Sequence, residues 1–123
     1  MRGVTEHPLA VFADGRGSLL KAHPGRVEGE VYAIVVTPGA SRGHHLHRLT
    51  TEVFVAVSGE GVVGVLDPGT GEVEHIPLQR RLEVGPGIAH AIFNLGDTEL
   101  VVVAAMDRPH DPDDVLRHEV PAP

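Results

Sequence analysis

Short runs of β-branched residues, each ended by a Gly or Pro turn, place the strongest limit on what this chain can fold into. Such runs occupy residues 30–39, 52–61, 62–78, 81–87, 89–97 and 98–106, so turn signals recur every 8 to 14 residues. No helical period of apolar residues continues for more than about two turns. This rhythm is typical of an antiparallel sandwich or barrel. We therefore predict an all-β fold, an antiparallel β-barrel or jelly roll.

The length of 123 residues and a hydrophobic content of 41 % fit one domain with one core. Aromatic residues make up only 3 %, so the core should be aliphatic. We expect a single domain over residues 1–123, with the barrel in about residues 9–106. Residues 107–123 are polar and proline-rich, and we expect them to form a tail with one helical turn near residues 113–118.

Charge and composition exclude several classes of function. The formal charge of −7 argues against sequence-independent binding of nucleic acid, because phosphate contacts need a basic surface. The absence of cysteine excludes disulfides and thiolate metal sites and fits a reducing compartment. No apolar run approaches the roughly 20 residues that a membrane span needs. We expect a cytoplasmic protein that binds neither nucleic acid nor a membrane.

Three histidines lie within four positions, in the stretch SRGHHLH at residues 41–47. On a strand, side chains two apart share a face, so His45 and His47 point the same way and His44 points to the other face. Glu52 begins the next strand among apolar neighbours, where a buried carboxylate would need a positive partner. His90 begins a further short strand. A divalent cation would satisfy these groups together.

The spacing of these residues is specific. The chain reads G-x5-H-x-H-x4-E-x6-G from Gly39 to Gly59, and G-x2-H-x3-N from Gly87 to Asn94. These two segments resemble the two motifs of the cupin superfamily, small β-barrels, over residues 30–106. The resemblance implies four metal ligands: His45, His47, Glu52 and His90. Apart from His44, we assign the other histidines to the surface or to turns: His7, His23, His75, His110 and His118.

Imidazoles combined with a carboxylate favour a divalent transition metal over Ca²⁺ or Mg²⁺, which prefer oxygen ligands. The candidates are Zn²⁺, Mn²⁺, Fe²⁺, Ni²⁺ and Co²⁺, with zinc slightly favoured. A closed tetrahedral zinc would be structural, whereas an ion with open positions could be catalytic. Both roles stay open at this point.

Three further features resemble the RmlC-like branch of the cupins. These are a D-x-R-G element at residues 14–17, an Arg-Gly pair directly before the histidines, and the C-terminal segment from residue 94. The branch includes dTDP-4-dehydrorhamnose 3,5-epimerase, dTDP-sugar ketoisomerases and the C-terminal cupin domain of capsular-polysaccharide biosynthesis proteins. The resemblance implies an isomerase or epimerase that acts on a nucleotide-linked keto sugar, a small-molecule substrate, by enolisation.

This interpretation assigns roles to four more residues. Arg16 and Arg42 are candidates for the diphosphate, because guanidinium binds phosphate oxygens in pairs. Tyr32 and His44 are candidates for proton transfer, although His44 faces away from His45. Barrels of this kind commonly pair through edge strands, so we expect a homodimer formed by residues 9–12 and 18–22. A metal-dependent oxygenase or general sugar isomerase, and a non-catalytic sugar- or metal-binding module, are the alternatives.

Overall fold

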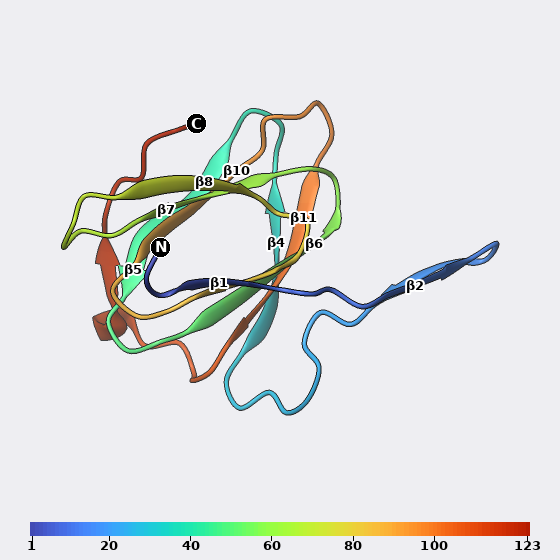
Figure 1. Cartoon of the computed structure of the whole chain (residues 1–123), viewed down its shortest axis with the longest axis horizontal. Helices are drawn as coiled ribbons and strands as arrows, with labels where there is room; N and C mark the ends of the chain where they lie inside the picture. The colour runs from blue at the N-terminus through green and yellow to red at the C-terminus, as the bar shows by residue number, and fades with distance from the viewer.

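The computed structural model describes all 123 residues and contains two five-stranded antiparallel sheets that face each other (Figure 1). The first sheet has the order β1 (Val4–His7), β9 (Arg81–Val84), β6 (Glu52–Ser58), β11 (Leu100–Met106) and β4 (Val31–Val36). The second has the order β12 (Val115–Arg117), β5 (Ser41–His47), β10 (Ala89–Phe93), β7 (Val62–Leu66) and β8 (Val73–Pro77). The predicted all-β antiparallel barrel is confirmed.

A small hairpin stands apart from the barrel. It consists of β2 (Val11–Asp14) and β3 (Gly17–Leu20), which pair only with each other and extend away from the sheets (Figure 1). Three of its large apolar side chains are exposed, with Phe12 at 59 % and Val11 and Leu19 close to that value. We refer to residues 11–20 as the arm.

The main core lies between the two sheets and is aliphatic, as the composition predicts. It includes Phe54, Leu82, Leu100 and Val102, all nearly inaccessible to solvent. A second, smaller cluster lies on the outer face of β5 and β10 and consists of Leu46, Ala89, Ala91, Phe93 and Val120. Side chains alternate between these two clusters along β10, so both faces of this strand are buried.

The C-terminal segment is part of the folded structure, and the expectation of a tail after residue 106 is wrong. Residues 112–114 form a 3-10 turn, capped by the side chain of Asp111, and β12 follows and pairs with β5. Val120 is buried in the outer cluster. The expected helical turn at residues 113–118 is therefore limited to residues 112–114, because strand pairing begins at Val115. The barrel also begins earlier than residue 9, since β1 pairs with β9.

A bulge in β5 changes which side chains face the barrel interior. His45 pairs with His90, but the next pair is Gly43 with Ala91, so His44 is the extra residue. Gly43 and His44 both have positive φ, at 110° and 56°. Beyond the bulge Arg42 pairs with Ile92, which belongs to the main core. Arg42 therefore lies on the interior face with His45, although strict alternation predicts the opposite face.

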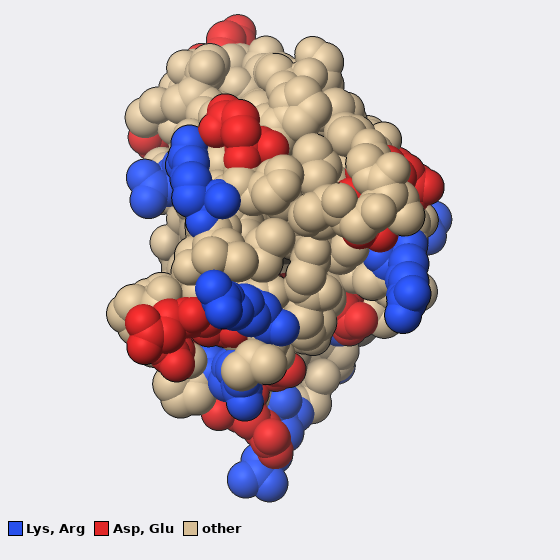
Figure 2. All heavy atoms as spheres, turned by 90° about the vertical axis from the view of Figure 1, so that its left-hand side faces the viewer, with Lys and Arg blue, Asp and Glu red and all other residues tan.

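Charges of both signs are mixed on the surface. On the face shown in Figure 2, basic and acidic side chains lie next to each other, and neither sign forms a continuous area. No helix in the structure has the length and apolar character that crossing a membrane would require.

Candidate metal centre and cavity

The four residues with metal-ligand spacing come together inside the barrel. His45 and His47 lie on β5, Glu52 on β6 and His90 on β10, and their ligand atoms all lie within 4.8 Å of one another. Glu52 Oε1 is 3.4 Å from His47 Nε2 and 3.3 Å from His90 Nε2. The two sheets therefore both contribute to the cluster, with Glu52 from the first sheet and the histidines from the second.

Three of these four residues carry a buried polar atom that has no hydrogen-bond partner. The atoms are His47 Nε2, His90 Nε2 and Glu52 Oε2. Glu52 is only 1 % exposed, and a buried carboxylate is costly unless a partner compensates it. A divalent cation among these atoms would satisfy all of them at once. The residues present thus fit the metal that the donor types favour.

Burial keeps two of the imidazoles neutral and ready to coordinate. Burial, helped by the neighbouring His90 and His47, lowers the pKa of His45 to about 4. Burial, again helped by His90, also lowers the pKa of His47. Metal binding needs an unprotonated imidazole nitrogen, so these two imidazoles are in their binding form at neutral pH.

Contacts outside the cluster orient two of the rings. His90 Nδ1 lies 3.4 Å from the Ile88 carbonyl oxygen, which leaves Nε2 for the cluster. His47 Nδ1 lies 3.6 Å from a carboxylate oxygen of Asp114. Burial raises the pKa of Asp114, but hydrogen bonds from the Thr50 hydroxyl and from backbone N–H groups outweigh it, so the pKa lies below the ordinary value.

Asp114 was not identified by sequence reasoning. It lies in the segment that we expected to be a tail, yet it is buried and accepts hydrogen bonds from Leu49 N and the Thr50 hydroxyl. The sequence offers only one local signal, the acidic run after Pro112, which marks the 3-10 turn. Nothing in that run indicates contact with the turn between β5 and β6, because the two segments are distant in sequence.

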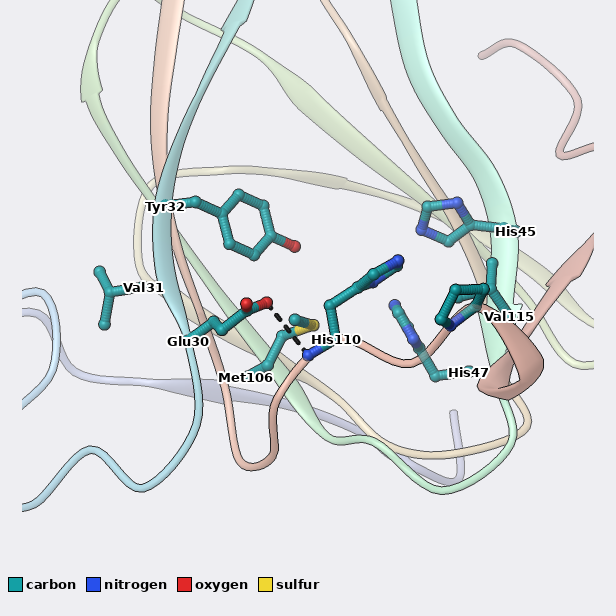
Figure 3. A pocket seen from close by; sticks show the side chains of 9 residues that line it. Glu30, Val31, Tyr32, His45, His47, Met106, His110 and Val115 are labelled. Carbon is teal, nitrogen blue, oxygen red and sulfur yellow. Dashed lines mark hydrogen bonds between the residues drawn. The ribbon is translucent and has the colours of Figure 1, made fainter.

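Two cavities meet at the metal-ligand cluster, and Tyr32 and His45 line both of them. The larger has a volume of about 750 Å³ and is also lined by Glu30, His47 and His110, among others. Figure 3 shows the Tyr32 ring from β4 directed into this space, opposite His45 and His47. The smaller, of about 360 Å³, reaches Arg42, Glu52 and His90. Tyr32 and Arg42 therefore both adjoin the cluster.

His110 lies on an exposed loop, as expected for a surface histidine, but it also lines the larger cavity. Its backbone N–H donates a hydrogen bond to Glu30 Oε2, at 3.1 Å. Sequence reasoning did not select Glu30 or His110 for the site. The Pro109 and Pro112 residues that flank His110 indicate a loop, but they do not indicate which cavity the loop borders.

The structure does not bring His44 and Arg16 to the cavities. His44 packs edge-on against Phe93 on the outer face, and both ring nitrogens are engaged. Its Nδ1 accepts from Val120 N at 3.2 Å, and its Nε2 lies 2.9 Å from the Ser41 hydroxyl. Arg16 lies on the arm, with its side chain 91 % exposed and paired with Asp14. Neither residue can contact a molecule bound at the cluster of its own chain.

Comparison with known proteins connects this geometry to one protein family. The family model for the polysaccharide biosynthesis C-terminal domain matches residues 12–115 of the chain. Among solved structures, the dTDP sugar isomerase from Desulfovibrio desulfuricans G20 superposes with a TM-score of 0.86 at 23 % identity. That alignment covers 99 % of this chain and 87 % of the isomerase. At this identity the likeness is one of fold.

A second structure has higher sequence identity. The capsular polysaccharide assembling protein CapF from Staphylococcus aureus is 29 % identical with a TM-score of 0.71, over 93 % of this chain and 35 % of CapF. Germin-like protein 3-5 from Oryza sativa subsp. japonica is 32 % identical over 74 residues, which is 57 % of this chain and 33 % of that protein. The chain thus spans about a third of the length of the curated relatives it matches.

Proposed function

Because the chain belongs to the family of polysaccharide biosynthesis C-terminal domains, we propose that it is a metal-binding cupin that isomerises or epimerises a nucleotide-linked keto sugar. One observation carries the proposal: a cavity of about 750 Å³ leads to a buried cluster of metal-ligand residues and is lined by a tyrosine. The name of the structurally similar dTDP sugar isomerase supports the same substrate class.

In this proposal His45, His47, Glu52 and His90 hold a divalent transition metal, with zinc slightly favoured among Zn²⁺, Mn²⁺, Fe²⁺, Ni²⁺ and Co²⁺. When bound, such an ion stabilises negative charge on a ketone oxygen as a Lewis acid. The unpartnered buried atoms of the cluster support this assignment.

Arg42 is the proposed contact for the diphosphate. It lines the smaller cavity, which continues to the metal-ligand cluster, because the bulge at His44 turns it to the interior face. A guanidinium offers paired N–H donors that match phosphate oxygens. Tyr32 lines both cavities, and we assign to its hydroxyl the donation of a proton to the sugar.

The arm supports a homodimer in the same proposal. Val11, Phe12 and Leu19 are exposed on a two-stranded sheet with free edges, and such a sheet is rarely stable alone in water. Arg16 lies on this arm and can act on a diphosphate only at the cavity of a second copy. Light scattering at micromolar concentration should give twice the monomer mass, and a monomer would contradict both the dimer and the role of Arg16.

The reaction is tested by exchange of a carbon-bound proton with solvent. Enolisation removes the proton next to the ketone, so incubation in D₂O should place deuterium at that carbon in a dTDP- or UDP-linked 4-keto sugar. A chelator should abolish the exchange if the metal stabilises the developing charge. No exchange with any sugar of the panel would contradict the enzyme and favour a binding module. Bound iron together with oxygen consumption would instead indicate an oxygenase.

A further inference from the structure

His110 is an imidazole in the larger cavity that the metal-ligand cluster does not use. Its side chain projects from the loop after β11 into the space between Tyr32 and His45 (Figure 3). Neither of its ring nitrogens is engaged in a hydrogen bond within the protein, whereas both nitrogens of His44 are. Outside the metal-ligand cluster, it is therefore the histidine that combines a place in the cavity with two free ring nitrogens.

The loop that carries His110 is held in place by two contacts. The Glu30 carboxylate accepts the backbone N–H of His110, which connects the loop to the start of β4 (Figure 3). Immediately afterwards, the Asp111 side chain caps the 3-10 turn that begins at Pro112. Because the backbone is held at His110 itself and at the residue that follows it, the imidazole has a defined place at the cavity wall.

Enolisation needs a base that the cavity must supply. The imidazoles of His45, His47 and His90 are committed to the metal in the proposed function, and a tyrosine hydroxyl, with an ordinary pKa of about 10, is a poor proton acceptor. Histidine is the side chain most often used for proton transfer near neutral pH. We propose, on the premise of the proposed function, that His110 is the general base that removes the proton next to the ketone of the sugar.

The step is balanced without an oxidant or reductant. A ring nitrogen of His110 forms the new N–H bond as the C–H bond next to the ketone breaks. The C–H electron pair becomes the carbon–carbon double bond of the enolate, and the C=O π pair moves to the oxygen. The Tyr32 hydroxyl, which points into the same cavity, returns a proton to carbon. Proton exchange with water then restores both side chains.

The test compares His110→Asn with wild type in the deuterium-exchange experiment, using dTDP-4-keto-6-deoxyglucose and its UDP counterpart in D₂O. We expect the exchange rate to fall about 10²- to 10⁴-fold, the range for loss of a general base. Bound metal, measured by mass spectrometry, and the Tm should stay at wild-type values. His110→Ala should recover part of the rate when imidazole is added, which a merely structural role would not produce.

Two further variants complete the design. His118→Asn changes another histidine of the C-terminal segment, outside both cavities, and should exchange at the wild-type rate. Glu30→Gln tests the carboxylate that lies beside His110. Deuterium exchange at the wild-type rate in His110→Asn would overturn the inference while leaving the proposed function intact. If Glu30→Gln lost exchange while His110→Asn retained it, the inference would be overturned in the same way. If His110→Asn lost its bound metal, His110 would be a metal ligand, and the assignment of His110 as general base would be overturned. A wild-type protein without exchange would overturn the proposed function itself.

Discussion

The two faces of strand β5 place two of its histidines in opposite situations. On the inner face, His47 Nε2 is buried without a hydrogen-bond partner and lies near a buried carboxylate. On the outer face, His44 is just as buried, but a hydroxyl and a backbone N–H satisfy its nitrogens. Burial alone therefore does not identify a functional histidine. The difference lies in whether its polar atoms are satisfied within the protein.

The largest expected effect is the loss of metal affinity when a residue on the inner face is replaced. We expect Glu52→Gln to weaken metal affinity more than about 100-fold, because even changes behind the ligands cost 10- to 100-fold. Calorimetric titration of the metal-free protein with Zn²⁺ measures the loss. The same change should not lower the Tm of the metal-free protein, since it removes a buried charge.

A matched control for this variant is Glu83→Gln on the neighbouring strand β9. Glu83 pairs in register with Val53 and is partly exposed beside His7. Its replacement should leave Zn²⁺ affinity unchanged. Equal loss of affinity in both variants would show that the inner cluster has no special role.

Replacement of a residue on the outer face should instead lower the stability of the protein. We expect His44→Ala to reduce the free energy of unfolding by about 1–3 kcal/mol, because it leaves the Val120 N–H buried without an acceptor. Urea denaturation measures this loss, and metal stoichiometry should be unchanged. His44→Asn should recover part of the stability, since its amide oxygen can accept from Val120. Loss of bound metal in His44→Ala would contradict the view that the inner face of β5, and not its outer face, contributes to metal binding.

The bulge that separates the two faces depends on Gly43. Its φ of 110° is unfavourable for any residue with a side chain, and a Cβ atom there would lie 3.0 Å from the His90 carbonyl oxygen. We expect Gly43→Ala to cost about 1–2 kcal/mol of stability in thermal or urea unfolding. It should also weaken binding of dTDP, because Arg42 reaches the interior face only beyond the bulge. Unchanged dTDP affinity would contradict the proposed contact between Arg42 and the diphosphate.

The last expected effect concerns the pH dependence of stability in the metal-free protein. The pKa of His45 is about 4 in the folded state, below the ordinary value of 6.5, so the unfolded chain binds more protons between these values. Stability should therefore be complete above about pH 6.5 and fall as the pH is lowered toward about 4. His45→Asn should reduce this loss in urea titrations at pH 7 and pH 5. An equally large loss of stability between pH 7 and pH 5 in the variant would contradict the assignment of this pH dependence to His45.

Much of this molecule follows from local pattern. The runs of β-branched residues between Gly and Pro turns determine the strands, because period-two alternation and turn chemistry are local properties. The run over residues 62–78, for example, folds into a hairpin, with Val62 paired to Pro77 and Leu66 to Val73. The spacing of His45, His47, Glu52 and His90 likewise indicated a common site, and the structure brings the four together.

Other features were decided only by tertiary structure. Strict alternation along β5 would place Arg42 on the outer face, and one extra residue reverses this, which depends on the register with β10. Asp114 and His110 reach the site because β12 pairs with β5 and the preceding loop crosses the cavity. The sequence by itself determined the strands, since these rest on short spacings, and the resemblance of its two motifs indicated the four residues that meet in the cluster. Contacts between distant segments required the fold, because chain packing sets them and no local pattern records them.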